Sequence, residues 1–412
     1  MTTPTKSKLL RNLIFIGLVS FFIDFSTEMV YPIIPLYLTM ALGATPAIVG
    51  VIEGLAESVA SLLRVFSGYI SDRFQKKKLL AFIGYAPATL YKLILLIAGS
   101  WAGVLGARVV DRIGKGIRTA PRDVLVSEST DKDNMGLAFG IHKALDMLGA
   151  ALGILVAFLL LRAMTNGFDF KFIFAVSIIP AVLGLGMFFF IHEHSRPRPT
   201  VQRESFWKNV HKVDGQLRLY LLVTFLFTLG NSSNAFILLK AYAVGFDVVN
   251  VVLLFFIYNA VASILSIPFG RLSDKIGRKK LLVSGYLVFA LCYLGFGFAP
   301  NHIVMIAAFV LYGAYTAMIT GVERAYIAEI ARPELKGTML GLQSTLAGIA
   351  LLPASIIAGL LWETLGSAAP FVFGAALSLL AAVLLLLFMR NRSTVSANGI
   401  DEISPVSDPE HG

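Results

Sequence analysis

Thirteen ionisable side chains in the first 150 residues lie within long apolar stretches of the sequence. In chain order they are Asp24, Glu28, Glu53, Glu57, Arg64, Lys92, Arg108, Asp111, Arg112, Lys115, His142, Lys143 and Asp146. A charge in apolar surroundings is costly unless it is paired or hydrated, so such residues mark proton exchange, ligand binding or ion pairing. The carboxylates can bind and release protons, and the bases can pair with them or hold an anion.

The spacing of these residues places them on single faces of helices. At about 100° per residue, Asp24 and Glu28 share one face of a first helix. A second helix carries Glu53, Glu57 and Arg64 on one face. A third gathers its charges within a sector of about 100°: Arg108, Asp111, Arg112 and Lys115. Three helices therefore each present one polar face.

The composition identifies the elements that must hold these faces as membrane spans. Of 412 residues, 57% are hydrophobic and only 15% are charged, whereas a soluble protein has about a quarter charged residues. Since a span needs about 20 apolar residues, the chain has room for about twelve. The expected spans are 12–40, 45–70, 79–99, 101–123, 136–162, 171–191, 217–243, 247–270, 280–298, 302–329, 337–362 and 367–390. The sequence predicts an all-α integral membrane protein.

The distribution of Lys and Arg predicts the orientation of these spans. The basic residues gather in alternate loops and in 196–218, while the opposite loops are nearly bare. The positive-inside rule therefore places both termini in the cytoplasm of a protein in the inner or plasma membrane. It also explains the net charge of +10 without a nucleic-acid partner. We expect a six-helix half in 1–191, a cytoplasmic linker in 192–216, a second half in 217–390 and a disordered tail in 391–412.

The two halves are copies of one unit. The loop at 68–78, Gly-Tyr-Ile-Ser-Asp-Arg-Phe-Gln-Lys-Lys-Lys, returns 202 residues later at 270–280 as Gly-Arg-Leu-Ser-Asp-Lys-Ile-Gly-Arg-Lys-Lys. At the same offset Glu57 matches Asn259, and a less secure alignment places Glu28 over Asn234. Acids in the first half thus become amides in the second, which has little within its spans beyond Lys240, Glu323 and Arg324.

Two interpretations of the charged cluster stay open. In the first, Asp24, Glu28 and Glu57 exchange protons, while Arg108 and Arg112 pair with them or clamp an anion. In the second, the charges are ion pairs that hold helices in register, and Arg64, Lys115 and Lys143 extend to the membrane surface. Because buried ion pairs stabilise poorly, we favour function near mid-span. The candidate residues for proton and substrate translocation are Asp24, Glu28, Glu53, Glu57, Arg108, Asp111, Arg112, His142 and Asp146.

The repeated loop resembles that between the second and third helices of the major facilitator superfamily. The resemblance implies twelve transmembrane helices in two pseudo-symmetric halves that rock around a central cavity lined by spans 1, 4, 7 and 10. It also implies that the two loops form a conformational latch, which stabilises the outward-facing state. The latch residues would be Gly68, Asp72, Arg73, Gly270, Asp274, Lys275, Gly277 and Arg278.

Three further motifs bear on a likeness to drug:proton antiporters. Residues 112–116, Arg-Ile-Gly-Lys-Gly, resemble the fourth-span motif whose arginine is linked to proton transfer. Residues 31–35, Tyr-Pro-Ile-Ile-Pro, resemble the end of the first span in that group. The fifth span departs from the antiporter signature, because Ala150 stands where proline is expected between Gly149 and Gly153. The direction of transport stays open.

The function that we expect is proton-coupled secondary transport of a small solute, with export by antiport as one form. The alternatives are facilitated diffusion of an organic anion held by Lys92, Arg108 and Arg112, and a membrane sensor on a transporter fold. An enzyme, a cofactor and a metal site are not expected, because the sequence has one cysteine, Cys292, and no nucleotide-binding loop. We expect a monomer in the lipid bilayer.

Overall fold

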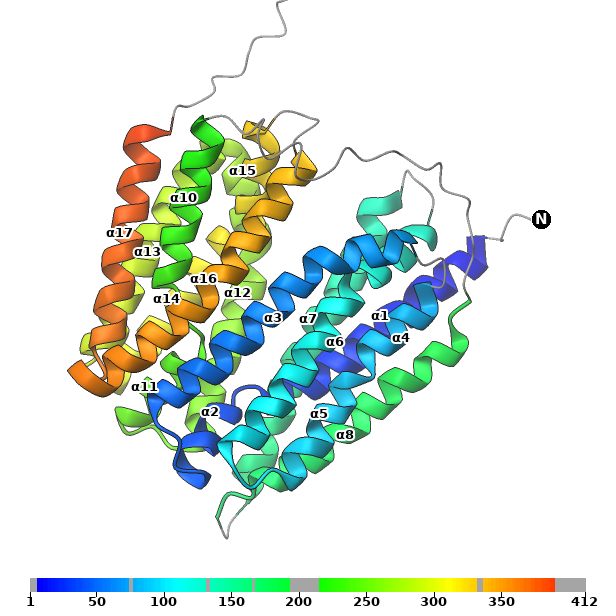
Figure 1. Ribbon diagram of the computed structural model, residues 1–412, viewed down its shortest axis with the longest axis horizontal. Helices are drawn as coiled ribbons and strands as arrows, with labels where there is room; N and C mark the ends of the chain where they lie inside the picture. Colours follow the sequence, from blue (N-terminus) through cyan, green and yellow to red (C-terminus); the bar gives the residue numbers. More distant parts are fainter. Residues whose placement is uncertain are drawn as a thin grey trace, which may run out of the picture.

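The computed structural model describes residues 6–73, 77–130, 134–164, 167–192, 215–331 and 336–389, and the regular elements in these ranges are helices (Figure 1). The expected tail and nearly all of the expected linker lie outside the described residues. Eleven described helical segments are long and apolar enough to cross a membrane. The expected fourth span is a helix of 28 residues that carries the charged sector around Arg112. The all-α prediction is confirmed.

The first group of helices corresponds to the expected spans 1 to 6. Its elements are α1 (Lys6–Val30), α2 (Ile34–Leu36), the π-helical turn η1 (Tyr37–Ala41), α3 (Pro46–Arg73), α4 (Lys77–Tyr85), α5 (Pro87–Ile97), α6 (Trp101–Glu128), α7 (Met135–Ala163), α8 (Phe170–Gly186) and the 3-10 turn η3 (Met187–Phe190). In this group α1 packs against α7 and α8, and α6 packs against α3, α4 and α5.

The second group corresponds to the expected spans 7 to 12. Its elements are α10 (Gly215–Gly230), α11 (Ala235–Ala243), α12 (Val248–Ile276), α13 (Arg278–Phe298), α14 (His302–Ile319), α15 (Val322–Ile330), α16 (Lys336–Leu365) and α17 (Ala369–Phe388). Here α12 packs against α14, α13 against α17, and α10 against α16 and α17.

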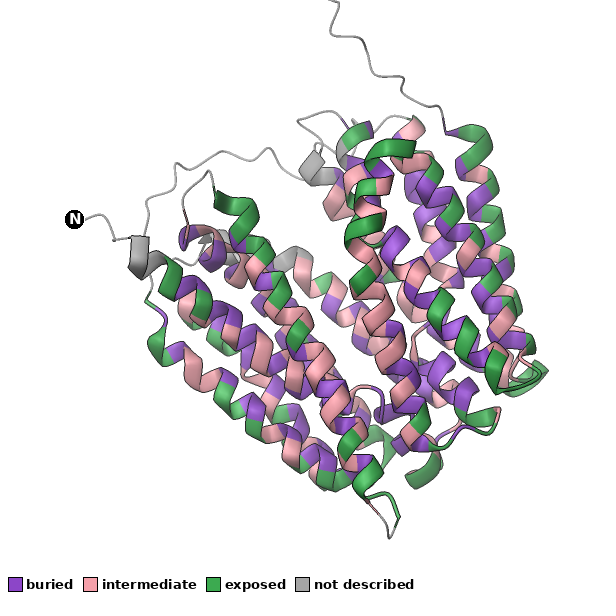
Figure 2. Cartoon of the chain, turned by 180° about the vertical axis from the view of Figure 1, so that it is seen from behind, coloured by how far each residue is buried: buried purple, intermediate pink, exposed green. Residues whose placement is uncertain are grey.

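Two helix pairs make the main contacts between the groups: α3 packs along α16, and α7 packs against α12 (Figure 1). Smaller contacts join α11 to α2 and α3. The ribbons of the two groups converge at the end where α2 and α11 lie and diverge at the end where α1 begins, in both Figure 1 and Figure 2. We call the diverging end the basic end, because it holds the cluster Lys77, Lys78, Arg278, Lys279 and Lys280.

Glycines permit the close crossing of α3 and α16. A Cβ on Gly54 would lie 3.0 Å from the carbonyl oxygen of Leu352, and one on Gly359 would lie 2.7 Å from the Cα of Ala47. The hydroxyl of Ser58 donates to the carbonyl of Gly348 at 2.6 Å. Since small residues let backbones approach each other, the two groups are held together by backbone contact along this crossing.

The expected first and seventh spans are both interrupted, which the sequence analysis did not predict. The first breaks between Val30 and Ile34, at the segment that begins the Pro-x-x-Pro motif. The seventh breaks between Gly230 and Ala235, where Asn231, Ser232, Ser233 and Asn234 follow one another. Asn and Ser side chains compete with helical backbone hydrogen bonds, which accounts for the second break.

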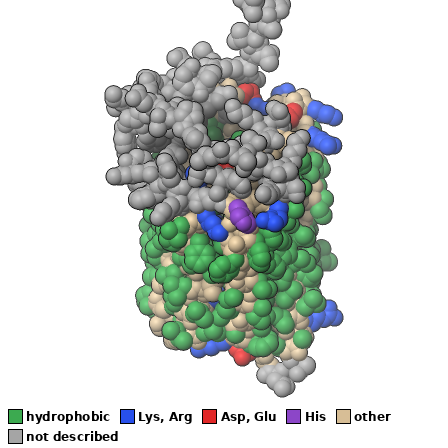
Figure 3. All heavy atoms as spheres, turned by 90° about the vertical axis from the view of Figure 1, so that its right-hand side faces the viewer, with side chains coloured by type: hydrophobic (Ala, Val, Ile, Leu, Met, Phe, Trp, Pro, Cys, Tyr) green, Lys and Arg blue, Asp and Glu red, His purple; other side chains and the backbone are tan. Residues whose placement is uncertain are grey.

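The outer surface carries the apolar band that a membrane protein requires. Figure 3 shows one face on which hydrophobic side chains form a continuous belt, with Lys and Arg at its margins. Large apolar side chains such as Ile97, Ile179, Ile264 and Leu387 are exposed on both groups. The ionisable candidates of the first group face inward instead.

Candidate functional site

A cavity of about 170 Å³ lies between the two groups of helices. Its first wall belongs to α1, α3 and α6 and to the break after α1, and its second to α12 and the break before α11. The lining residues are Glu28, Tyr31, Glu57, Arg112, Lys115, Asn234, Phe255, Tyr258 and Asn259. The first wall therefore carries every ionised group of the lining, and the second offers amides and aromatic rings.

The internal repeat explains this asymmetry. Glu57 and Asn259, matched by the repeat, line the same cavity from opposite walls. Glu28 and Asn234, the less securely aligned pair, do so as well. The fold thus places Glu28 and Glu57 across the cavity from the amides that replace them in the second group.

Glu57 forms an ion pair with Arg112 at the edge of this cavity. The Oε1 of Glu57 lies 2.8 Å from Nη2 of Arg112, and their side chains are 30% and 3% exposed. The Nη1 of the same arginine lies 3.5 Å from Oδ2 of Asp111. Arg112 therefore stands between a carboxylate that reaches the cavity and one that is buried.

Glu28 and Lys115 also line the cavity, but neither is in an ion pair with another described residue. In the second interpretation of the charged cluster Lys115 extends to the membrane surface, but the structure places it in the cavity lining. Its side chain instead faces the space between the two groups, because position 115 follows Arg112 by three residues and shares its helix face. The cavity thus offers one carboxylate and one ammonium group outside ion-pair contact.

Glu53 and Arg108 form a deeper ion pair, beneath the lining. The Nη2 of Arg108 lies 2.6 Å from Oε2 of Glu53, and the two side chains are 0% and 2% exposed respectively. The hydroxyl of Ser233, from the second group, donates to the same carboxylate at 3.4 Å. The guanidinium also lies over the ring of Tyr31, 5.4 Å from its centroid. This pair therefore connects four spans and both groups of helices.

Asp24 and Asp146 lie together elsewhere, between α1 and α7. Their carboxyls interact across the packed contact between these two helices. Arg118 lies 3.8 Å from Asp24, and Lys143 lies 3.2 Å from Asp146. His142, also on α7, is buried, and its Nε2 makes a hydrogen bond of 2.9 Å with the hydroxyl of Ser20. None of these side chains lines the cavity.

The anion clamp of Lys92, Arg108 and Arg112 is not assembled. Lys92 is wholly buried, donates to the carbonyl of Ala88 at 2.6 Å and does not line the cavity. Arg108 is buried against Glu53. The expectation of a three-base clamp was wrong.

The second group contributes a polar network that the sequence analysis missed. The hydroxyl of Tyr312 donates to Oδ1 of Asn234 at 2.9 Å, and Nδ2 of Asn231 donates to the hydroxyl of Tyr315 at 3.2 Å. The ring of Tyr312 also lies 5.1 Å from that of Tyr258. The signal that could have found this wall is the pair of asparagines at positions matched to Glu28 and Glu57.

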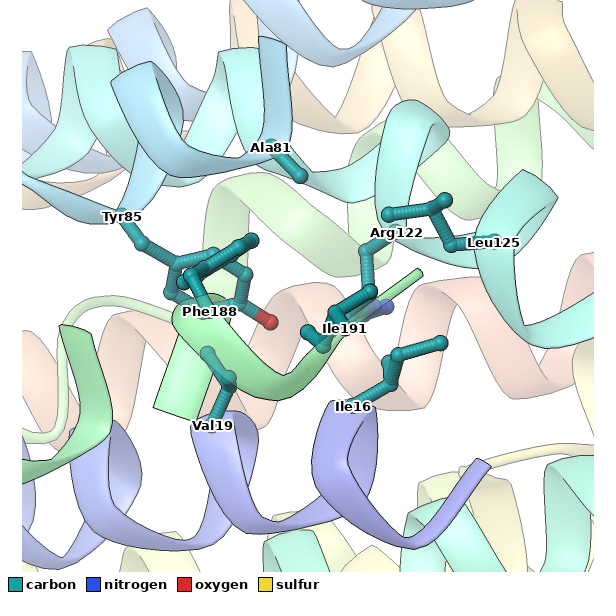
Figure 4. Close-up of a pocket in the computed structure, with 8 residues that line it drawn as sticks. All are labelled: Ile16, Val19, Ala81, Tyr85, Arg122, Leu125, Phe188 and Ile191. Atoms are coloured by element: carbon teal, nitrogen blue, oxygen red, sulfur yellow. The ribbon is translucent and has the colours of Figure 1, made fainter. Parts of the chain in front are cut away.

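A second hollow lies within the first group, among α1, α4, α6 and η3 (Figure 4). Its lining is apolar apart from Tyr85 and Arg122, and it has essentially no room for a water molecule. Arg122 pairs with Asp123 at 2.8 Å. This hollow holds packed side chains and is not a candidate site.

The described latch residues are joined within the second group. Arg278 lies 3.2 Å from Asp274 and 3.0 Å from Glu329 on α15. The carboxylate of Asp274 is 67% exposed and makes no ion pair with a described residue of the first group. Gly270 and Lys275 lie on α12, and Gly277 has a φ of 95° where α12 turns into α13. Gly68, Asp72 and Arg73 lie in the last turns of α3, but their side chains are outside the described part.

The described residues contain no group of three or more His, Cys, Asp or Glu side chains that could hold a metal ion.

Comparisons with known proteins agree with this architecture. The family model of the Major Facilitator Superfamily matches residues 16–233 and 220–407. An uncharacterized MFS-type transporter of Methanocaldococcus jannaschii is 35% identical over 388 residues, which cover 92% of this chain and 95% of that protein. Multidrug resistance protein 2 of Bacillus subtilis is 32% identical over 129 residues, 30% of this chain and 31% of that protein. A crystal structure of a mutant nucleoside transporter NupG has a TM-score of 0.80 at 10% identity and covers 91% of this chain and 98% of that one. The chain is a multi-pass membrane protein that belongs to the Major Facilitator Superfamily of transporters.

Proposed function

We propose that the protein is a proton-coupled secondary transporter that moves a small solute through the cavity between its two groups of helices. The observation that carries this proposal is the Glu57–Arg112 ion pair at the cavity edge. A carboxylate that is paired with an arginine and partly exposed to the solute path can couple protonation to a change of partner.

The coupling step that we propose is an exchange of partners at Arg112. When Glu57 takes up a proton it loses its charge, and Arg112 is left with Asp111, which already lies 3.5 Å from Nη1. The electrostatic attraction between α3 and α6 at the cavity edge weakens as a result. The more deeply buried ion pair of Glu53 and Arg108 still holds the two helices together. Protonation would thus alter the cavity wall without dismantling the first group of helices.

We further propose that the basic end lies in the cytoplasm, with both termini, and that the membrane is the inner or plasma membrane. This orientation rests on the distribution of Lys and Arg. Because the two groups diverge at the basic end, the structure would then represent an inward-facing state. Export in exchange for protons is favoured over uptake by the partial likeness to multidrug resistance protein 2 and by the Pro-x-x-Pro segment after α1.

Solute-induced proton flux tests the proposal. The purified full-length protein is reconstituted into vesicles that contain a pH-sensitive dye, and an imposed pH gradient is followed while anions, cations, zwitterions and lipophilic drugs are added in turn. We expect at least one class to accelerate dissipation of the gradient. Solute movement that proceeds equally well without a gradient, and carries no protons, would contradict the coupling and leave a facilitator.

The latch gives a separate prediction, which concerns Asp274. Its carboxylate is exposed and has no described partner in the first group, as expected of a latch that is open in this state. Asp274→Asn should therefore leave the melting temperature nearly unchanged, because an exposed ion pair contributes about 1 kcal/mol or less. It should shift the population toward the inward-facing state, measured as faster labelling of cysteines introduced in the cavity from the basic end. Labelling rates equal to the parent from both sides would refute the latch.

A further inference from the structure

The charges of the cavity wall fall into two kinds. Glu57 and Arg112 face each other at 2.8 Å and neutralise each other. Glu28 on α1 and Lys115 on α6 line the same cavity, and each is outside ion-pair contact with the rest of the described chain. The cavity therefore presents one negative and one positive group outside ion-pair contact, on different helices.

A ligand with only one charge leaves half of this arrangement unsatisfied. An organic cation placed on Glu28 removes water from Lys115 without offering it a partner, and an organic anion on Lys115 does the same to Glu28. Removing water from an ionised group without pairing it is costly. A solute that carries both charges satisfies both groups at once, so complementarity favours it over either singly charged analogue.

The opposite wall fits the rest of such a solute. Phe255 and Tyr258 present rings 5.5 Å apart, and the ring of Tyr31 lies 5.6 Å from that of Phe255. Asn234 and Asn259 add neutral hydrogen-bonding groups. The space of about 170 Å³ is close to the ~150 Å³ cavity that holds a benzene molecule. Because Phe255 and Tyr258 are nearly buried behind this wall, the fit is to a short solute with two charged ends.

We propose, resting on the transport function proposed above, that the solute is a small zwitterion. Its cationic group binds Glu28, its anionic group binds Lys115, and its middle part lies beside Asn234 and Asn259. The charge on each wall residue is then used for recognition, while the Glu57–Arg112 pair remains available for the proton.

The test measures binding to the purified full-length protein by titration calorimetry and by thermal shift. A series of ω-amino acids, from glycine through 4-aminobutyrate to 6-aminohexanoate, varies the distance between the two charges, and leucine and phenylalanine vary the apolar body. Each probe is compared with its N-acetylated form, which keeps only the negative charge, and with its amide, which keeps only the positive charge. We expect one charge separation to bind best, and either blocked form to bind about tenfold or more weakly.

Two variants assign the ends of the solute. Glu28→Gln should bind the zwitterion no more tightly than its N-acetylated form, but still more tightly than its amide. Lys115→Gln should bind the zwitterion no more tightly than its amide, but still more tightly than its N-acetylated form. Glu363→Gln and Lys171→Gln make the same chemical changes at exposed positions outside the cavity lining and should bind as the parent does. Melting temperatures without ligand show whether each variant is folded.

The outcomes separate this inference from the transport proposal. Blocked forms that bind as well as the parent zwitterions, or proton flux induced by another solute class with no zwitterion bound, would overturn the inference and leave coupled transport standing. Zwitterion binding that depends on Glu28 and Lys115, but without any proton flux, would support the inference and overturn the coupling.

Discussion

Glu53→Gln is expected to lower the stability of the folded protein by about 3–5 kcal/mol, the usual cost of breaking a buried ion pair on one side. The change leaves the guanidinium of Arg108 wholly buried without a counter-charge. Its Nε and Nη1 already lack hydrogen-bond partners, so the guanidinium has no other acceptor to turn to among the described residues. The measurement is the melting temperature in detergent and in lipid.

A double variant distinguishes the loss of pairing from other damage. Glu53→Leu combined with Arg108→Met removes both charges and keeps apolar volume, and such replacements of buried pairs are often neutral or stabilising. We expect it to recover most of the melting temperature that Glu53→Gln loses. If Glu53→Gln melts with the parent, the carboxyl is already neutral in the folded state and the pair is not an ion pair.

The opposite result is expected one helical turn along α3, at Glu57. Glu57→Asn introduces the residue that the repeat has at Asn259, and the carboxylate that it removes is 30% exposed at the cavity edge. Packing should therefore survive, and Arg112 keeps Asp111 within reach. The variant should bind solute but lose accumulation driven by a pH gradient, because an amide cannot exchange a proton. The measurement pairs gradient-driven uptake with the melting temperature of the same preparation.

The repeat supplies the control. Asn259→Ala alters the matched position on the opposite wall and should preserve coupling, since no proton is exchanged there. Gradient-driven transport at the parental rate by Glu57→Asn would exclude Glu57 as the coupling residue. A large drop in melting temperature with coupling intact would assign the Glu57–Arg112 pair to structure instead.

Much of the fold is predictable because a membrane span can be recognised in the sequence by its length and apolar composition. The eleven segments that meet this criterion agree with the expected spans. The fourth expected span is α6, whose charged residues keep its mean hydropathy below that of the other spans. Helical spacing still predicts it, since Arg108 and Arg112 share one face. The breaks after Val30 and Gly230 escaped prediction, because the segments that contain them are long and apolar enough on average to count as single spans.

The site could be predicted only in part, because helix contacts decide which charges meet. Sequence spacing places Asp24 and Glu28 on one face of α1. In the structure, however, Asp24 lies against Asp146 of α7, whereas Glu28 lines the cavity. Lys115 is long enough to point in either direction, and only the packing of α6 against α3 decides between them. The second wall could be predicted from the repeat alone, because Asn234 and Asn259 stand at the positions that match Glu28 and Glu57.

The confinement of charge to one wall has an electrical consequence. With Glu28, Glu57, Arg112 and Lys115 ionised, the cavity lining carries no net charge, and a bound zwitterion adds none. The membrane potential then exerts little force on the carrier, whether empty or loaded. One added proton makes the lining positive, and moving a unit charge across the full potential is worth about 2.3 kcal/mol per 100 mV. The voltage across the membrane would therefore act on the carrier chiefly through the proton on Glu57, and not through the solute.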